Sequence, residues 1–189
     1  MSITIPEQKK RLRAAYLALR ATLPHKRELD LALCREIAAH AAFRDCDTLL
    51  AFAPTKGEPD LTPLYRIALE RGLCVAFPRC TGKQMSFHTV SALTELSPGR
   101  FDILTPSENA PRASLGAHTL CLLPALAATK DGYRLGYGGG FYDRFLPAFP
   151  GITLLPIYSA LLCDALPRED TDIPATHILT EKGVLLPYG

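Results

Sequence analysis

The residues TLLAFAPTKGEPDLTPLYRIALERGLCVAFP, at positions 48–78, predict a strand, a loop, a helix and a second strand in that order. Residues 48–53 and 73–77 are short apolar runs, each followed by a proline, which is typical of buried strands. Between them, a polar loop leads into a helical segment that ends at Gly72. Two strands joined by a helix form a βαβ unit with a parallel strand pair. We therefore expect an α/β fold.

Further helices and strands are expected on both sides of this unit. Leu12, Tyr16, Leu19 and Leu23 have the spacing of one apolar helix face, which predicts a helix that begins at Pro6 and packs through these residues. The other expected elements are a helix over 26–41 packing through Leu29, Leu33 and Ile37, an edge strand at 85–90, loops with short pieces of structure at 91–118, a strand at 120–123, a loop at 127–138, a helix over 139–149 with core contacts at Phe141, Phe145 and Leu146, and strands at 152–157, 178–179 and 184–186.

The composition indicates one globular domain that spans residues 1–189, because no linker or repeat divides the chain. The formal net charge of +2 is too small to indicate a nucleic-acid partner. Every apolar run is shorter than the roughly 18 residues of a membrane span, and no signal-peptide core follows residue 6. The six cysteines form no C-x-x-C pair and no zinc spacing with the five histidines, so we expect reduced thiols. These features predict a monomeric cytoplasmic protein without a membrane partner.

Residues 132–143, GYRLGYGGGFYD, carry the strongest sign of a ligand site. Four glycines among positions 136–140 cost backbone entropy, and such loops often bring the backbone close to a ligand. The loop precedes a helix, whose first N–H groups can bind an anion. Arg134 can bind a phosphate, and Asp143 can hold Mg²⁺ beside it. The alternative is a glycine turn with an ordinary acid after it, and the segment matches neither a P-loop nor a dinucleotide fingerprint.

Charged residues in three other segments could join this site. Lys9, Arg13 and Arg20 form a narrow basic stripe beside the apolar face of the first helix, although such stripes are usually only solvated. Glu58 follows a strand, where α/β sheets place ligand groups. Asp172 lies in an acidic segment and is a candidate second or outer carboxylate, the alternative being an ordinary acidic turn. No Ser/His/Asp or Cys/His pattern predicts a protein nucleophile.

Residues 122–127 (LLPALA) and 132–143 together closely resemble the signature of the 5-formyltetrahydrofolate cyclo-ligase (5,10-methenyltetrahydrofolate synthetase) family. Shorter family motifs match in order along nearly the whole chain, namely K-x-x-L-R at 9–13, G-E at 57–58, P-R at 78–79, D-x-P at 172–174 and T-E at 180–181. The resemblance implies a three-layer α/β/α sandwich with a mostly parallel, Rossmann-like central sheet.

The resemblance also implies a reaction and its participants. ATP and 5-formyltetrahydrofolate would give 5,10-methenyltetrahydrofolate, ADP and phosphate, with Mg²⁺ as the cofactor. The formyl oxygen would attack the γ-phosphate of ATP, and the folate N10 would then displace phosphate from the activated carbon. Such chemistry depends mainly on positioning and charge neutralisation, which agrees with the missing nucleophile pattern.

The same resemblance implies the roles of individual residues. Arg134 and Lys9 would be catalytic. ATP would be bound by Lys9, Arg13, Arg134, Leu135, Gly136, Tyr137, Gly138, Gly139, Gly140 and Tyr142. Glu58, Phe52 and Tyr142 would contact the folate, and Asp143 and Asp172 would hold Mg²⁺. The chain departs from the family pattern at Phe141, often a tyrosine, and at Thr176, where many relatives carry a second aspartate.

Two other functions are compatible with the pattern. One is a binding module that senses a nucleotide or phosphosugar without turnover, because one α/β scaffold hosts many functions. The other is a different ATP-dependent ligase, which would keep Arg134 and the glycines but lose the contact of Glu58 with a folate. A phosphate sensor has no need for both Glu58 and Asp143, so metal-dependent ATP turnover separates it from an enzyme.

Overall fold

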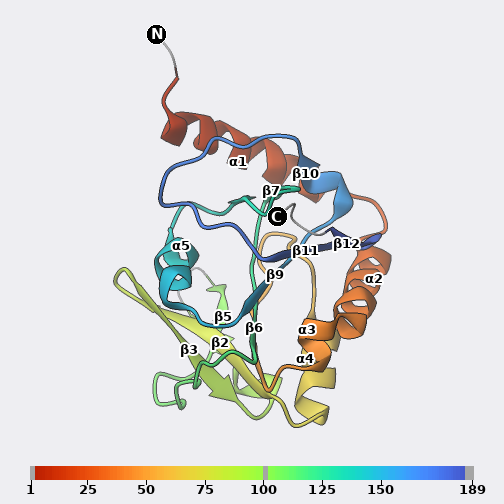
Figure 1. Cartoon of the computed structure of the whole chain (residues 1–189), viewed down its shortest axis with the longest axis vertical. Helices are drawn as coiled ribbons and strands as arrows, with labels where there is room; N and C mark the ends of the chain where they lie inside the picture. Colours follow the sequence, from red (N-terminus) through yellow and green to blue (C-terminus); the bar gives the residue numbers. More distant parts are fainter. Residues whose placement is uncertain (1–2, 100–101, 186–189) are drawn as a thin grey trace.

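The computed structural model of the chain describes residues 3–99 and 102–185 (Figure 1). Its centre is a seven-stranded sheet in the order β12-β11-β9-β6-β1-β2-β3. The inner strands are parallel, whereas β12 and β3 at the two edges are antiparallel to their neighbours. This confirms the mostly parallel sheet and the edge strand. The strands are β1 Thr48–Leu50, β2 Cys74–Thr81, β3 Gln84–Val90, β6 Thr119–Leu122, β9 Ile152–Pro156, β11 His177–Thr180 and β12 Gly183–Leu185, and Leu186 of the expected last strand lies outside the described residues.

The expected βαβ unit consists of β1, α4 (Thr62–Glu70) and β2. Leu49 of β1 lies opposite Val75 of β2 in a parallel register, and both side chains are buried. Tyr65 of α4 packs edge-on against Phe77 of β2 with the ring centroids 5.3 Å apart. Each such buried side chain contributes about 1.5–3 kcal/mol, so the crossover helix is fixed on the sheet mainly by apolar burial.

Helices cover the sheet from two sides, as a three-layer sandwich requires. Figure 1 shows α2 (Lys26–Ala39), α3 (Ala41–Arg44) and α4 on one side and α5 (Phe141–Phe145) on the other. The second helix was expected to continue to residue 41, but it ends at Ala39. His40 has an extended backbone and accepts a hydrogen bond from Ala42 N at 3.2 Å, so it caps α3 instead of continuing α2.

Residues 127–138 were expected to be a loop, and this expectation is wrong in part. β7 (Ala127–Thr129) and β8 (Arg134–Leu135) form an antiparallel hairpin, and β10 (Leu162–Cys163) pairs with β7 in parallel. These strands have two or three residues, too few to give a periodic signal. Arg134 therefore lies on strand β8 and not in a loop. Short pieces are also present in the expected loop at 91–118, where β4 (Ser97–Pro98) pairs with β5 (Leu104–Thr105).

The helix expected over residues 139–149 is shorter than predicted. α5 begins after Gly140, whose φ of 62° is left-handed and ends any helical path from Gly139. Leu146–Ala148 is a 3-10 turn, since Pro147 interrupts the α-helical hydrogen bonds. Phe145 and Leu146 belong to the core as expected, but Phe141 does not, because its ring lies under Arg144 outside the core cluster.

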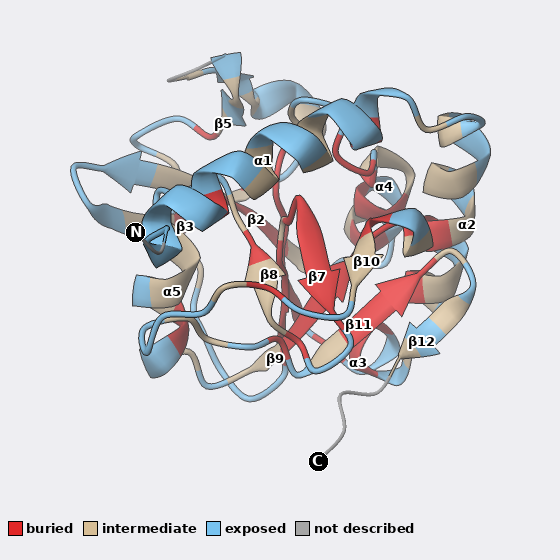
Figure 2. Ribbon diagram, turned by 90° about the horizontal axis from the view of Figure 1, so that it is seen from above, coloured by how far each residue is buried: buried red, intermediate tan, exposed pale blue. Residues whose placement is uncertain are grey.

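The first helix, α1 (Ile5–Ala21), is placed only partly as expected (Figure 2). Leu19 of the predicted apolar stripe is 43% exposed, while Leu12, Tyr16 and Leu23 are partly buried. The buried residues of α1 are instead Lys9 and Arg20, from the basic stripe. The polar inner face of α1 therefore covers a site and not only a core.

Candidate functional site

The site lies at the carboxyl ends of β1 and β6, where ligands bind in open α/β sheets. Four segments meet there, namely α1, the loop at 51–58, the glycine-rich loop at 136–140 and the segment at 169–173. Arg20 of α1 donates to the carbonyl oxygens of Lys56 and Ala125, each at 3.1 Å, and Arg13 donates to the Gly136 carbonyl at 2.8 Å. The long inner face of α1 thus joins the loops that carry the candidate residues.

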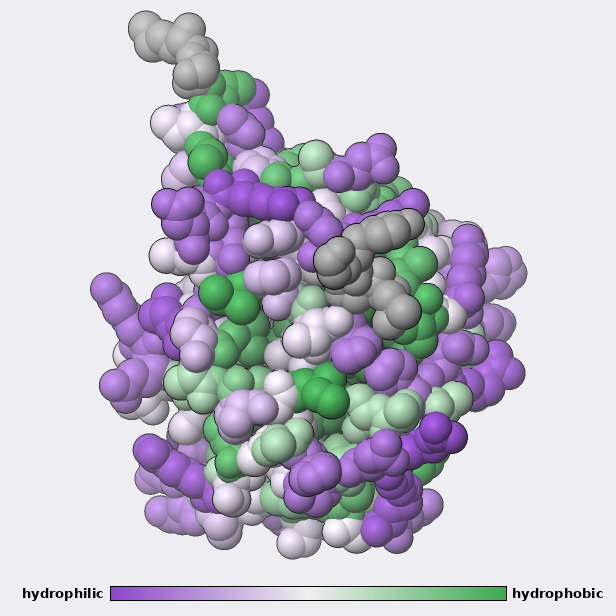
Figure 3. Space-filling view, in the orientation of Figure 1, coloured by the Kyte–Doolittle hydropathy of each residue, from purple (hydrophilic) through white to green (hydrophobic). Residues whose placement is uncertain are grey.

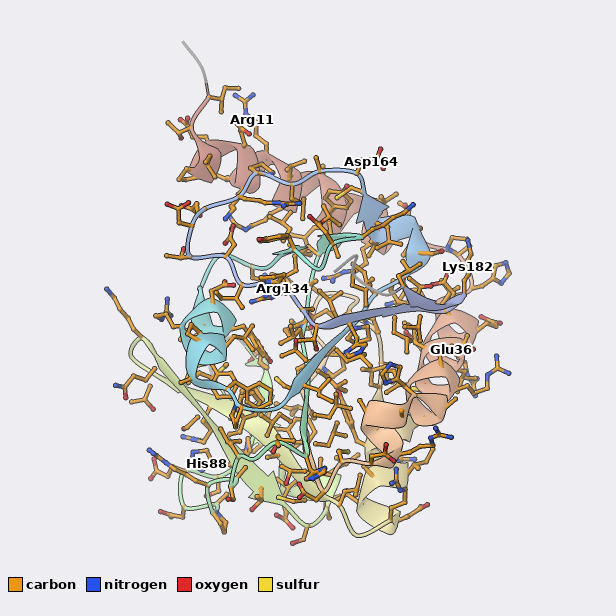
Figure 4. The ribbon with its side chains drawn as sticks, in the orientation of Figure 1. Arg11, Glu36, His88, Arg134, Asp164 and Lys182 are labelled. Carbon is orange, nitrogen blue, oxygen red and sulfur yellow. The ribbon has the colours of Figure 1, made fainter. Side chains whose placement is uncertain are left out.

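Arg134 and Asp143 form one ion pair in the middle of this site. Figure 4 shows Arg134 near the centre of the molecule, between α1 and the main sheet. Its Nη2 lies 2.7 Å from Asp143 Oδ1, and its Nη1 donates to the Ile173 carbonyl at 2.6 Å. The Ile173 N–H also donates to Asp143 Oδ1, at 3.3 Å. The motif therefore places its arginine and its aspartate in contact with each other and with the 169–173 segment.

Lys9 contacts the second candidate aspartate. Its Nζ lies 2.7 Å from Asp172 Oδ2 and 2.7 Å from Glu169 Oε2. Burial works against the charged ammonium, but the two carboxylates raise the pKa of Lys9 above its ordinary value. Lys9 is therefore a fixed positive charge at this end of the site, and Asp172 is one of the groups that hold it.

Arg13 packs directly on the glycine-rich loop. A Cβ at Gly138 would lie 3.1 Å from Arg13 Cζ, and the φ of Gly138 is 95°. Both observations require glycine at this position, the first for space and the second for conformation. The guanidinium therefore lies directly against the loop backbone, so both can donate to one anion bound beside them.

Glu58 is a buried carboxyl group with an unpaired oxygen. Its side chain is 4% exposed, and Oε2 accepts a hydrogen bond from Thr55 N at 2.9 Å. Oε1 has no hydrogen-bond partner among the described residues. Burial raises the pKa of Glu58 to about 7, although the Thr55 hydrogen bond and the Arg20 charge lower it. An unpaired buried oxygen is costly unless a ligand or a water satisfies it.

Tyr142 supplies a second unpaired group near Glu58. Its hydroxyl is buried and has no hydrogen-bond partner in the described part of the chain. Burial raises the pKa of Tyr142 well above its ordinary value, and the nearby Glu58 carboxylate acts in the same direction. The hydroxyl is therefore a neutral donor at neutral pH. Phe52, the third predicted folate contact, is 3% exposed and lies in the core cluster, where its carbonyl accepts from Tyr65 at 2.9 Å.

The predicted metal ligands do not share one carboxylate cluster. Among the residues that the structure describes, no three His, Cys, Asp or Glu side chains are arranged to hold a metal ion. Asp172 is engaged by Lys9 and by the Glu169 N–H, whereas Asp143 has one oxygen, Oδ2, without a hydrogen bond from those residues. Mg²⁺ commonly takes one or two carboxylates together with phosphate oxygens, so Asp143 fits this ion when a nucleotide supplies the other ligands.

Two residues at the site carry functions that were not predicted from the sequence. Arg20 is completely buried, and its Nη2 also donates to the Tyr137 hydroxyl. Glu169 holds Lys9 together with Asp172. Arg20 belongs to the basic stripe of the first helix, which was a signal for its place in the site. No spacing rule connects Glu169 to a helix 160 positions earlier.

The arrangement combines three cations, three carboxylates that pair with two of them, a glycine-rich loop and two buried unpaired polar groups. Arg13 contacts the glycine-rich loop, Lys9 and Arg134 contact the 169–173 segment, and Glu58 and Tyr142 supply the unpaired groups. Such a site can bind a polyanion beside its cations and a polar heteroaromatic ring beside the unpaired Glu58 and Tyr142 groups.

The outer surface shown in Figure 3 is mostly hydrophilic along α1 and α2, with apolar residues in small separate patches. No helix within residues 3–99 and 102–185 is long and apolar enough to cross a membrane.

Comparisons with known proteins agree on one family. Residues 5–181 match the family model described as the 5-formyltetrahydrofolate cyclo-ligase family. A 5-formyltetrahydrofolate cyclo-ligase of Mycolicibacterium smegmatis is 30% identical over 186 residues, which cover 94% of this chain and 95% of that protein. The mouse (Mus musculus) 5-formyltetrahydrofolate cyclo-ligase is 24% identical, and the match covers 95% of this chain and 97% of the mouse protein.

Solved structures have the same architecture. The NMR structure of Aquifex aeolicus 5,10-methenyltetrahydrofolate synthetase has a TM-score of 0.83 and 30% sequence identity, covering 96% of this chain and 93% of that one. The 5,10-methenyltetrahydrofolate synthetase of Mycoplasma pneumoniae has a TM-score of 0.72 at 20% identity, covering 92% and 98%, and supports the fold alone.

Proposed function

Because the chain belongs to the 5-formyltetrahydrofolate cyclo-ligase family, we propose that it converts 5-formyltetrahydrofolate to 5,10-methenyltetrahydrofolate with ATP and Mg²⁺, releasing ADP and phosphate. The family and the similar structures support an enzyme that carries out this conversion. The dependence on ATP and Mg²⁺ is our proposal. The observation that carries the proposed reaction is the buried, unpaired Glu58 oxygen in a site that also contains Arg13 against the glycine-rich loop and the Arg134–Asp143 ion pair.

We assign the nucleotide to the basic side of the site. Lys9, Arg13 and Arg134 would contact the phosphates, together with the backbone of the loop from Leu135 to Gly140 and with Tyr142. Arg134 and Lys9 are the catalytic residues of this proposal, because they neutralise charge on the phosphoryl group during transfer. Their carboxylate partners, Asp143 and Asp172, keep these cations in place.

In this proposal the folate binds beside Glu58, with Glu58 accepting from the pterin N–H groups and Tyr142 and Phe52 beside the ring. The formyl oxygen forms a bond to the γ-phosphorus, and the bond from that phosphorus to ADP breaks. The substrate N10 then bonds to the formyl carbon and loses its proton, and the carbon–oxygen bond to phosphate breaks. No protein nucleophile is needed, so the enzyme contributes alignment of two substrates.

Mg²⁺ would be held by Asp143, with Asp172 as an outer carboxylate that also keeps Lys9 in position. The ion would neutralise charge on the β- and γ-phosphates of the nucleotide. The unpaired Oδ2 of Asp143 supports this assignment.

The free cysteines and the exposed hydrophobic side chains bear on the location and the oligomeric state of the enzyme. Cys34, Cys46 and Cys121 are buried free thiols, which supports a reducing compartment, and we propose a cytoplasmic location. The exposed large hydrophobic side chains come from separate elements, such as Leu31 of α2 and Ile67 of α4, which supports a monomer that acts on small molecules.

One assay tests the proposed reaction against its alternatives. The protein is mixed with ATP, Mg²⁺ and 5-formyltetrahydrofolate, and both the near-ultraviolet absorbance of the methenyl product and the release of ADP are followed. We expect equal amounts of both products, formed only when all three components are present. ATP binding without turnover would favour the sensing module. ADP release that does not depend on the folate would favour a different ATP-dependent ligase.

A further inference from the structure

Arg20 connects three parts of the site from a fully buried position. Its Nε donates to the Lys56 carbonyl and its Nη1 to the Ala125 carbonyl, each at 3.1 Å. Its Nη2 donates to the Tyr137 hydroxyl in the glycine-rich loop. A buried guanidinium is stable only when its donors are satisfied, so these contacts fix the loop at 51–58 relative to the glycine-rich loop.

Tyr137 continues this connection toward Glu58. Its hydroxyl accepts from Arg20 and lies 3.5 Å from the Thr55 carbonyl, to which it donates. Thr55 also donates its N–H to Glu58 Oε2. Lys56 Nζ lies 5.5 Å from the Tyr137 ring centroid, on the exposed side. The tyrosine of the proposed nucleotide loop is therefore attached to the loop that carries the proposed folate carboxylate.

The Tyr137 hydroxyl is among the groups that interact with the Glu58 carboxylate. Burial raises the pKa of Glu58 to about 7, and the charged form is favoured in return by Thr55, by Arg20 and by the Tyr137 hydroxyl. Lys26 of α2 acts in the same direction and has the smallest effect of these groups.

Two neutral hydroxyl groups complete the surroundings, Tyr65 of α4 and Tyr142 of α5, whose own pKa values are raised by burial and by the Glu58 charge. Among these groups, Tyr137 is the one that belongs to the glycine-rich loop.

We propose that Tyr137, held in place by Arg20, is a positioning residue that keeps the Glu58 carboxylate charged and oriented for 5-formyltetrahydrofolate. The inference rests on the proposed function of Glu58 as the folate-binding acid. The glycine-rich loop thereby has two functions: its backbone faces the nucleotide, and the tyrosine hydroxyl sets the affinity for the other substrate. Loss of the hydroxyl alone leaves Arg20 Nη2 without its partner and Glu58 with one stabilising neighbour fewer.

The test is Tyr137→Phe, which keeps the ring and removes only the hydroxyl. The rate of folate-dependent ADP release is measured from pH 6.5 to pH 9 for the wild type and the variant. At pH 7 we expect the KM for 5-formyltetrahydrofolate to rise about fivefold and the KM for ATP to change less than about twofold. Because the pKa of Glu58 rises further in the variant, the difference in folate KM should close as the pH approaches 9.

A second measurement tests the effect of the Tyr137 hydroxyl on the pKa of Glu58 directly, without enzyme turnover. The Glu58 carboxyl carbon is followed by NMR during a pH titration of ¹³C-glutamate-labelled protein, with Glu58→Gln used to assign the signal. We expect Tyr137→Phe to raise the pKa of Glu58 above the wild-type value. The matched control is Tyr133→Phe, because Tyr133 lies outside this network, with its ring 3.9 Å from Arg168 Cζ.

The outcomes separate this inference from the proposed function. A raised Glu58 pKa together with a folate KM defect that closes at high pH supports the inference. An unchanged Glu58 pKa in a folded Tyr137→Phe variant overturns it, even if the enzyme is active. A folate KM that rises equally at every pH also overturns it, since that result indicates a purely structural hydroxyl. If the wild-type protein shows no folate-dependent ADP release, the proposed function is overturned, and the folate part of this inference is overturned with it. The NMR titration would still show whether Tyr137 affects the pKa of Glu58.

Discussion

The Arg134 guanidinium uses its two ends for different partners, an aspartate and a backbone carbonyl. Arg134→Lys keeps the positive charge but cannot reproduce this forked geometry. We expect kcat/KM for ATP to fall about 100-fold while the folate KM changes less than about threefold. Steady-state kinetics with each substrate varied in turn measures both. Arg168→Lys is the control, because that arginine pairs with Asp131 and is 40% exposed. ATP kinetics like those of the wild type would exclude a role of the Arg134 fork.

The two candidate metal carboxylates have different partners, which leads to different expectations for their amides. Asp143→Asn removes charge from the oxygen that has no hydrogen bond from the described residues, so the Mg²⁺ concentration for half-maximal rate should rise at least about tenfold. Asp172→Asn weakens the hold on Lys9 instead. It should raise the KM for ATP and leave the Mg²⁺ requirement within about twofold. A reversed pattern in the Mg²⁺ titrations would move the metal to Asp172.

The residues of the site were predictable where they share a motif and unpredictable where they meet across the chain. Arg134 and Asp143 are nine positions apart, and a glycine-rich loop before a helix already indicates an anion site. Lys9 and Asp172 are 163 positions apart, and nothing in either local sequence states that they form an ion pair. Arg20 shows the same limit, since a basic stripe on a helix has the same pattern whether it faces water or a buried site.

At the scale of elements, the glycine-rich loop can be tested one glycine at a time. Gly138→Ala places a Cβ 3.1 Å from Arg13 Cζ on a backbone with φ of 95°, whereas a Cβ at Gly136 meets no atom within 4 Å. We expect Gly138→Ala to lower the free energy of unfolding by about 1–2 kcal/mol and to raise the KM for ATP about tenfold. Gly136→Ala is the matched control and should change both little. Urea unfolding and ATP kinetics measure the pair, and equal effects of the two changes would contradict this view of the loop.

The elements themselves were predictable in proportion to their length. The βαβ unit around α4 was expected from apolar runs ended by prolines, and the structure contains it. β7 and β8 were missed because two or three residues cannot show a period, and their pairing depends on burial beneath α1. α1 was found as a helix, and Leu12, Tyr16 and Leu23 of the predicted stripe pack against the core, but Leu19 is exposed. Tertiary contacts determine orientation, and a helical period alone does not.

At the scale of the whole molecule, the end of the sheet opposite the site contains a pair of histidines. The rings of His40 and His177 lie 5.0 Å apart, edge to face. Burial lowers the pKa of each below the ordinary value of 6.5, and their mutual repulsion adds to this for His40. Below pH 6.5 the unfolded chain therefore binds more protons than the folded one, and stability decreases as the pH falls.

His40→Asn tests this source of acid sensitivity. Asparagine can still cap α3 but does not titrate, so the variant should match the wild type at pH 8. At pH 5.5 it should be more stable by a few tenths to about 1 kcal/mol, a modest gain because the histidines are only partly shielded from solvent. Urea unfolding at both pH values measures the difference, and a gain that is the same at both would instead indicate a better cap.

Glu58 has the opposite effect on stability in the same pH range. Its pKa is raised from 4.5 to about 7 in the folded protein, so the folded chain takes up this proton first as the pH falls. Wild-type stability therefore includes a cost of the buried charge that is fully present above pH 7 and disappears toward pH 4.5. Glu58→Gln carries no charge at any pH. It should be as stable as the wild type near pH 4.5 and more stable at pH 8 by up to about 3 kcal/mol.

The same variant should lose folate binding, with a folate KM raised at least about tenfold and a smaller change in the KM for ATP. A gain in stability that accompanies a loss of affinity is expected when a fold keeps a buried charge for its ligand. Urea unfolding at pH 5 and pH 8, together with kinetics for both substrates, measures the two effects on one protein. A stability difference that does not change between these pH values would mean that the Glu58 charge costs the fold nothing. Equal losses of folate and ATP affinity would count against Glu58 as the folate acid.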